Sequence, residues 1–308
     1  MPLHRLARIE VGVPEAQLAA TCAFYRDFGL DEDAAGRLAS AEGGEQLRFV
    51  PASRRTLLAL TVGVDDADDL GRAEAALEKL GIASERGAGV FAAREPVTGI
   101  RAQLAIEPRI AQKPSDALTS NAPGRTARVN ARSPAAYAAA VKPRPRRLSH
   151  VVTTSTDPVA TRRFFVEGLG FRVSDEIAGL GAAFLRCSTD HHNLLVQPGP
   201  FAFLHHTAWE MDDVDAVGAA AAAMVAADPK RHAWGLGRHA IGSNYFWYLR
   251  DPAGNFAEYT SDLDVIADEE AWRVASSLPV AGLAAWGPPV PREFLAPEDI
   301  VALARGAA

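Results

Sequence analysis

Three side chains that can bind a metal lie in the second half of the chain, each in a run of apolar residues. They are His150, one of the adjacent pair His205 and His206, and Glu258. Two imidazoles and one carboxylate form the facial ligand set of non-haem Fe(II), which leaves coordination positions open. Chemistry on O2 requires open positions. The residue types therefore indicate a mononuclear oxygen-activating metal site.

Each of these residues also has a simpler interpretation. A buried histidine is commonly a hydrogen-bonded structural residue, and Glu258 could belong to a surface ion pair. Because successive side chains of a strand point to opposite faces, only one of His205 and His206 is expected to face the site. The metal hypothesis therefore depends on the three strands being brought together by the fold.

A weak internal repeat, with an offset near 142 residues, suggests how the strands meet. Each half has an apolar strand, a helix with an aromatic pair, and a middle strand that runs into an acidic helix start. The matching segments are 6–11 and 148–153, 57–64 and 206–211, and the turns that open at Glu95 and Asp251. A curved sheet built from such modules can direct side chains from facing strands into one cavity.

The repeat also provides an internal comparison for the ligands. The position that matches His150 is Arg8, the one that matches His206 is about Ala59, and Gln103 approximately matches Glu258. The first half therefore keeps the module without the ligands, as expected of a site confined to the second half.

These patterns predict an α+β protein with two tandem domains. The expected boundaries are 1–110 for a degenerate, metal-free domain, 111–146 for a linker rich in Pro, Ser, Ala and Arg, and 147–262 for the catalytic domain. The tail, 263–308, contains apolar residues around Trp286 and is expected to pack back on the domains.

Composition excludes several other classes of protein. The formal net charge is −6 and the pI about 5.8, so neither a nucleic-acid nor a membrane-surface partner is indicated. Two cysteines, Cys22 and Cys187, exclude a disulfide framework and a cysteine-rich zinc site. No stretch approaches the roughly 20 apolar residues of a membrane span. A cytoplasmic location is expected.

The full set of motifs resembles a known family. The two-fold module resembles the vicinal oxygen chelate superfamily, in which paired βαβββ units form an open barrel, and the second half resembles type I extradiol dioxygenases. The segments that carry the resemblance are Leu148–Val151, Asp190–Asn193, Leu204–Thr207, Gly237–His239 and Tyr248–Tyr259. The resemblance implies cleavage of a catechol-type ring by O2, next to the diol, to a muconic semialdehyde-type product.

The resemblance also implies the metal ligands. In the family the second histidine of the adjacent pair binds metal, which favours His206 over His205. His150, His206 and Glu258 would then hold Fe(II), and Mn(II) accepts the same ligand set.

Further roles follow from the same resemblance. His192 would be the acid/base residue, and His239 and Tyr248 would bind the substrate oxygens. Asn193 and Trp234 are also predicted to contact the substrate. Trp234 stands near the place where relatives that act on carboxylated catechols carry arginine, so a neutral or apolar ring substituent is expected. Without the metal set, His192 would be read as a turn residue and Tyr248 as a sheet-face aromatic.

Other functions of the same fold stay open at this point. A 4-hydroxyphenylpyruvate dioxygenase-like enzyme would use the same ligands in its second half, but would not need His192, His239 and Tyr248. A glyoxalase-like isomerase takes ligands from both halves, and a metal-free small-molecule-binding protein would have lost them. The family commonly forms homo-oligomers, so the resemblance implies a homo-oligomer.

Overall fold

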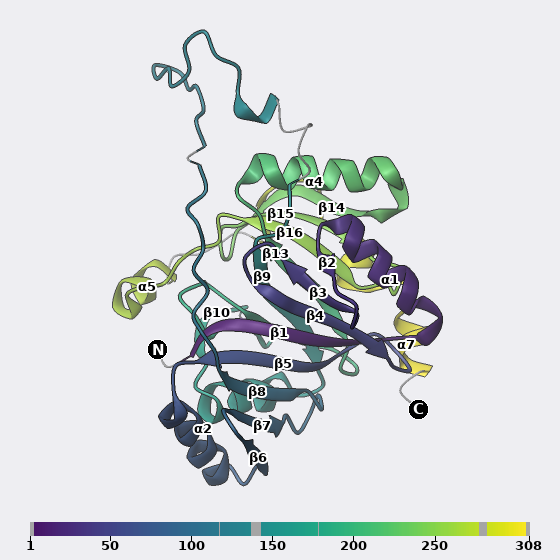
Figure 1. Cartoon of the computed structure of the whole chain (residues 1–308), viewed down its shortest axis with the longest axis vertical. Coiled ribbons are helices and arrows are strands. Elements are labelled where there is room, and N and C mark those ends of the chain that lie inside the picture. Colours follow the sequence, from purple (N-terminus) through teal and green to yellow (C-terminus); the bar gives the residue numbers. More distant parts are fainter. Residues whose placement is uncertain (1–2, 117, 137–142, 178, 277–281, 306–308) are drawn as a thin grey trace.

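The computed structural model describes residues 3–116, 118–136, 143–177, 179–276 and 282–305, and these form two mixed sheets with helices packed against them (Figure 1). The first half contains β1 (Leu3–Val13), α1 (Glu15–Phe28), β2 (Asp31–Glu32), β3 (Arg37–Ser40), β4 (Gly44–Pro51), β5 (Thr56–Val64), α2 (Ala67–Lys79), β6 (Ser84–Gly87), β7 (Val90–Arg94) and β8 (Arg101–Ile106).

The second half repeats this order of elements and adds a tail. It contains β9 (Arg147–Ser155), α3 (Pro158–Arg163), the π-helix η2 (Phe164–Gly168), β10 (Arg172–Ile177), β11 (Ala182–Arg186), β12 (Leu194–Pro198), β13 (Leu204–Glu210), α4 (Val214–Ala227), the 3-10 turn η3 (Pro229–Arg231), β14 (His232–His239), β15 (Tyr245–Arg250) and β16 (Phe256–Ser261). The tail holds α5 (Glu269–Ser276), β17 (Ala284–Trp286), α6 (Arg292–Leu295) and α7 (Ile300–Arg305).

Strand order confirms the predicted repeat and the α+β fold class. The first sheet runs β2-β3-β4-β1-β5-β8-β7-β6, and the second runs β10-β11-β12-β9-β13-β16-β15-β14-β17. In both, the first strand of the half pairs in parallel with the fourth and antiparallel with the fifth. Each half is thus two βαβββ modules joined in one curved sheet, with β17 as an addition.

Pairing register also confirms the predicted correspondence between the halves. In the second sheet, Ala208 lies opposite both His150 and Glu258. In the first sheet, Thr61 lies opposite both Arg8 and Gln103. His206 precedes Ala208 by two positions, just as Ala59 precedes Thr61, so the three ligand positions have direct structural equivalents in the first half.

The acidic residues expected at helix starts cap their helices. Asp66 accepts from the backbone N–H groups of Asp68 and Asp69 at the start of α2. Asp157 and Asp213 accept from N–H groups in the first turns of α3 and α4. These bonds satisfy backbone donors that a helix leaves unpaired at its N-terminus, so each fixes where the helix begins.

One hydrophobic core joins the two halves. Helix α1 of the first half packs against β13 and β16 of the second half. The Tyr259 hydroxyl donates to the Phe28 carbonyl at 2.7 Å, and their rings stack 3.8 Å apart. Tyr25 and Thr207 share a hydrogen bond of 3.1 Å between their hydroxyls. The first half therefore supports, from behind, the two strands that carry His206 and Glu258.

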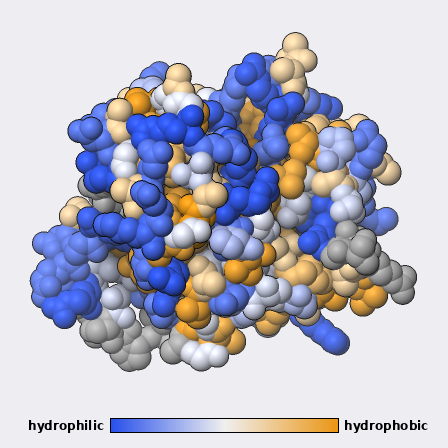
Figure 2. Space-filling model, turned by 90° about the horizontal axis from the view of Figure 1, so that it is seen from below, coloured by the Kyte–Doolittle hydropathy of each residue, from blue (hydrophilic) through white to orange (hydrophobic). Residues whose placement is uncertain are grey.

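The segment between the halves extends away from this core. In Figure 1 the chain that follows β8 rises beyond both sheets before it returns to β9. Its described residues are mostly exposed, with one isolated bridge between Ala122 and Arg125. On the face drawn in Figure 2, hydrophilic and hydrophobic residues are intermixed. Among the described helices, none has the length and apolar character needed to cross a membrane.

Candidate metal centre and substrate cavity

The three predicted ligands converge in the second sheet. His150 lies on β9, His206 on β13 and Glu258 on β16, three adjacent strands, and all three are buried. One ligand atom from each lies within 4.8 Å of the other two. Glu258 Oε2 is 3.2 Å from His150 Nε2 and 3.5 Å from His206 Nε2. The predicted convergence of these residues is thus confirmed in space.

Hydrogen bonding shows that this cluster fits a cation. His206 Nε2 and Glu258 Oε2 are buried and have no hydrogen-bond partner. The other carboxylate oxygen, Oε1, accepts from Asn244 Nδ2 at 3.1 Å. A buried carboxylate oxygen without a partner is costly, and a divalent cation held by two imidazoles and one carboxylate would remove that cost. The donor set suits Fe(II) or Mn(II).

A cavity of about 730 Å³ opens onto the cluster. Polar side chains line the end that holds the ligands: His150, His192, His205, His206, His239, Asn244 and Tyr248. The remaining walls are mainly apolar and include Val152, Ile177, Phe184, Leu195, Ile241 and Phe294. This division suits a molecule with a polar end directed at the metal and an apolar remainder.

His239 and Tyr248 form a hydrogen-bonded pair at the edge of the cavity. His239 Nε2 is 2.9 Å from the Tyr248 hydroxyl, and its Nδ1 is 3.1 Å from the Leu283 carbonyl. Because a carbonyl only accepts, Nδ1 donates in neutral His239 and Nε2 accepts from Tyr248. Burial raises the pKa of Tyr248, as does the charge of Glu258. Burial also lowers the pKa of His239, so both residues are neutral hydrogen-bonding groups near pH 7.

His192 lies directly beside the ligands. Its ring centroid is 4.1 Å from that of His150 and 5.0 Å from that of Phe184. Burial, followed by the neighbouring His150 and His191, lowers its pKa well below the usual value for histidine. A neutral imidazole in this place can accept a proton from a bound molecule.

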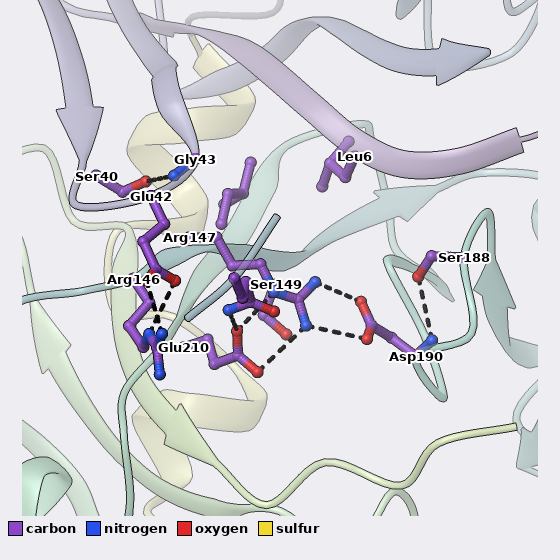
Figure 3. Close-up of polar contacts among 12 residues, drawn as sticks. Leu6, Ser40, Glu42, Gly43, Arg146, Arg147, Ser149, Ser188, Asp190 and Glu210 are labelled. Carbon is purple, nitrogen blue, oxygen red and sulfur yellow. Dashed lines mark hydrogen bonds and ion pairs between the residues drawn. The ribbon is translucent and has the colours of Figure 1, made fainter. Parts of the chain in front are cut away.

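An ion-pair network fastens the loop that carries His192. Arg147, at the start of β9, donates to both carboxylate oxygens of Asp190 at 2.6 and 3.0 Å, and also to Glu210 at the end of β13 (Figure 3). Burial alone would raise the pKa of Asp190, but the guanidinium lowers it below its usual value. The network ties loop 187–193 to the strands that carry His150 and His206.

The expectation that His205 faces away from the site is wrong. Both His205 and His206 line the cavity, and their Nδ1 atoms are 2.8 Å apart. The pairing between β13 and β9 shifts between Leu204 and His206. Such an irregularity breaks the strict alternation of side chains along a strand, so adjacent residues can reach one side. Only His206 keeps a free ring nitrogen, because His205 Nε2 is bonded to the Phe294 carbonyl at 2.7 Å.

Asn193, a predicted substrate contact, is held by hydrogen bonds within the protein. The Asn193 side chain is buried, is absent from the cavity wall, and bonds to Cys187 N, Ser149 O and Asp190. Its register equivalent in the first half is Gln46, which binds the Leu6 and Ala7 carbonyls in the same manner. Since the half without ligands keeps this amide, its role is to hold the turn.

Trp234 is likewise removed from the cavity wall. Its indole N–H donates to the Pro288 carbonyl at 2.9 Å, and its ring lies parallel to that of Tyr248, with centroids 5.7 Å apart. Trp234 therefore packs against Tyr248, and its predicted contact with the substrate stays a prediction.

Two features of the site were missed by the sequence interpretation. Asn244 holds Glu258, and its position directly before β15, at period-two spacing from Tyr248, is a signal that could have identified it. Phe294, from the tail, closes one side of the cavity and its ring centroid is 4.6 Å from that of Tyr248. The tail was expected to pack back, but no local pattern singles out Phe294.

Comparison with known proteins agrees with this geometry. Residues 147–259 match the family described as the Glyoxalase/Bleomycin resistance protein/Dioxygenase superfamily. The second half of the chain is therefore similar to members of this superfamily. Relatives that match in sequence include a metapyrocatechase and an iron-dependent extradiol dioxygenase.

Two curated relatives and one solved structure illustrate the similarity. The chain is 39% identical over 155 residues to "Metapyrocatechase 2" of Cupriavidus necator, covering 49% of this chain and 47% of that protein. It is 30% identical over 154 residues to "Iron-dependent extradiol dioxygenase" of Rhodococcus jostii, covering 46% and 50%. The matches thus span about half the length of these relatives.

The solved structure is 2,2',3-trihydroxybiphenyl 1,2-dioxygenase from Sphingomonas wittichii. It superposes with a TM-score of 0.70 at 20% identity, over 94% of this chain and 100% of that one. At this identity the match shows a shared fold that extends through both halves.

Proposed function

We propose that this chain is an extradiol ring-cleavage dioxygenase that inserts both atoms of O2 into a catechol-type substrate at mononuclear non-haem Fe(II). The observation that carries the proposal is the buried His150, His206 and Glu258 cluster, with two unpartnered ligand atoms at the polar end of a cavity. Similarity to a metapyrocatechase and to an iron-dependent extradiol dioxygenase supports it.

The ligand set leaves room for both reactants. Fe(II) held by three protein side chains would have positions for the two diol oxygens and for O2, and would allow electron transfer between them. The His239–Tyr248 pair orients the ring through its oxygens, and the apolar walls exclude water. Holding reactants in one geometry in this way lowers the barrier substantially.

His192 handles protons in this proposal. One catechol hydroxyl loses a proton as the diol binds, and neutral His192 is placed beside the cluster to accept it. The same residue then returns a proton to oxygen as the ring opens, next to the diol, to a muconic semialdehyde-type product. A positioned acid or base of this kind typically contributes about 100- to 10,000-fold in rate.

The cavity favours a neutral, apolar ring substituent. Among the described residues that line it, none is lysine or arginine, and the charged ones are Asp175 and Glu176. A carboxylated ring would meet like charge without a cation to pair with. A second aryl ring would instead contact Ile177, Phe184 and Leu195. At about 25 cal/mol per Å², burial of that ring would add to affinity.

The test uses protein purified without O2 and loaded with Fe(II). O2 consumption and a yellow ring-opened product are measured with catechol, 3-methylcatechol, 2,3-dihydroxybiphenyl and the carboxylated 3,4-dihydroxybenzoate. We expect turnover of the neutral diols, with the highest kcat/KM for 2,3-dihydroxybiphenyl and the lowest for the carboxylate. Glu258→Gln is the matched inactive control. Failure of the iron-loaded protein to consume O2 with any diol would overturn the proposal and favour a binding protein.

A further inference from the structure

Two pairs of adjacent histidines are built alike around the cavity. His191 and His192 precede β12, and His205 and His206 lie on β13. Within each pair the two Nδ1 atoms face each other, 3.0 Å apart in the first pair and 2.8 Å in the second. All four rings are buried. In each pair the second histidine is the one assigned a role at the metal centre.

The first histidine of each pair is anchored by its other nitrogen. His191 Nε2 is 2.8 Å from Asp175 Oδ2, and His205 Nε2 is 2.7 Å from the Phe294 carbonyl oxygen. A carboxylate oxygen and a carbonyl oxygen both only accept, so Nε2 must donate in each case. A neutral imidazole has one donor and one acceptor. Nδ1 of His191 and of His205 is therefore the acceptor.

The direction of the bond between the rings follows from this. Because Nδ1 of the first ring accepts, Nδ1 of the second ring must carry the hydrogen and donate. The second ring is then left with a lone pair on Nε2. In His206 that atom is the buried, unpartnered ligand nitrogen of the metal cluster. In His192 it is the ring nitrogen that remains available beside the cluster.

We propose that His191 and His205 are positioning residues that fix the tautomers of His192 and His206, so that both present an Nε2 lone pair to the cavity. Asp175 on β10 and the Phe294 carbonyl in the tail are the two anchors. The part that concerns His192 rests on the proposed function. The part that concerns His206 requires only that the cluster binds a metal. Partners of this kind orient metal-binding histidines in other proteins.

Both anchors are themselves held in place. The Trp272 indole donates to the Ser174 carbonyl at 2.9 Å, beside Asp175, and its ring centroid is 5.2 Å from that of His191. Arg55, from the first half, forms a two-bond ion pair with Asp299 of the tail, close in sequence to α6 and Phe294. The positions of Asp175 and of the Phe294 carbonyl are therefore set by contacts outside the site.

The test replaces each first histidine in two ways. Phe preserves the approximate shape but removes both hydrogen bonds, whereas Gln supplies an N–H for the anchor and a carbonyl that accepts from the second ring. His191→Phe is expected to lower kcat about 10- to 100-fold, with Fe(II) affinity unchanged, and His205→Phe to lower Fe(II) affinity about 10- to 100-fold. The matching Gln variants should recover most of each loss. Fe(II) affinity is measured without O2 by competition with a chromophoric chelator, and kcat and KM with 2,3-dihydroxybiphenyl.

The outcomes separate positioning from packing. Equal losses in the Phe and Gln variants of a pair, or no loss in the Phe variants, would overturn the proposal. Circular dichroism checks folding. If His191→Phe does not fold, Asp175→Ala, which alters a partly exposed side chain, must lower kcat without changing Fe(II) affinity; an unchanged kcat would again overturn it. If no diol is turned over by the wild type, the proposed function fails. The His205 variants still test the positioning of His206, because Fe(II) affinity alone measures it.

Discussion

The two halves of this protein share a strand framework, yet only one has a metal site. Arg8 and Gln103 occupy the sheet positions of His150 and Glu258, and Ala59 that of His206. The main chain is thus the same in pairing order and register. The difference between the halves lies in the side chains at three positions and in how those side chains are paired.

Charge pairing makes the difference explicit. In the first half, Arg8 pairs with Glu107, which also accepts from Arg5 at 2.6 Å, and the Arg8 side chain is 48% exposed. In the second half, the Glu258 carboxylate is 0% exposed and one of its oxygens has no hydrogen-bond partner. The charges of the first half are neutralised by each other and solvated, whereas the buried Glu258 carboxylate has an oxygen that is suited to bind a cation.

The largest effect is expected from Glu258→Gln, which keeps the side-chain volume and removes the charge. Loss of a ligand should exceed the effect of losing an outer partner, so Fe(II) affinity should fall by more than about 100-fold and turnover should be lost. Metal content after anaerobic loading and O2 uptake provide the measurements. Retention of stoichiometric iron by the variant would show that this carboxylate is not a ligand.

The effect of Fe(II) on stability provides a second test of the same site. Fe(II) at about 100 times its dissociation constant should stabilise the wild type by about 2.7 kcal/mol, since only the folded chain has the site. This shift in the free energy of unfolding, followed by anaerobic denaturant titration, should vanish in Glu258→Gln. A shift that persists in the variant would place the metal elsewhere.

The next effect concerns His192, whose register equivalent in the first half is the exposed Glu45. His192→Phe should lower kcat about 100- to 10,000-fold, because it removes a positioned acid and base, while iron content stays intact. Glu45→Gln, the matched variant, should leave kcat unchanged. Loss of iron from His192→Phe would mean that His192 is a ligand rather than a proton carrier.

A smaller and symmetric effect is expected for the two buried amides. Asn193→Ala and Gln46→Ala should each destabilise the fold by about 1–3 kcal/mol, because each leaves buried backbone and side-chain groups unpaired. Denaturant unfolding measures this. Neither variant should change KM for a diol beyond the effect of lost stability. A selective rise in KM for Asn193→Ala would restore it as a substrate contact.

The sequence was sufficient for the features that repeat or alternate. The offset between the halves identified Arg8, Ala59 and Gln103 as equivalents of the ligands, and the pairing register confirms all three. Acidic helix starts such as Asp66 and Asp213 were equally readable, since their effect is local. The internal repeat and local sequence patterns are therefore sufficient to predict the fold and the metal cluster.

Features set by tertiary contacts could not be read in this way. The irregular pairing beside His205 depends on how β13 meets β9, and it reverses the side expected from alternation. Phe294 reaches the cavity only because the tail folds back onto His205. Trp234 was assigned by its place near a substrate-contacting position in relatives, whereas its orientation is decided by Pro288. Each depends on a partner distant in sequence.

The smallest effect is expected in the first half, which lacks the metal ligands. Glu107→Gln removes the carboxylate that neutralises Arg5 and Arg8, and it should cost no more than about 1 kcal/mol of unfolding free energy, because partly exposed ion pairs contribute little. Fe(II) affinity and kcat should both match the wild type, in contrast to Glu258→Gln. Denaturant unfolding and chelator competition measure the two quantities. A fall in Fe(II) affinity would show that the charge of the first half reaches the metal centre, and the separation of the two halves into scaffold and site would then be wrong.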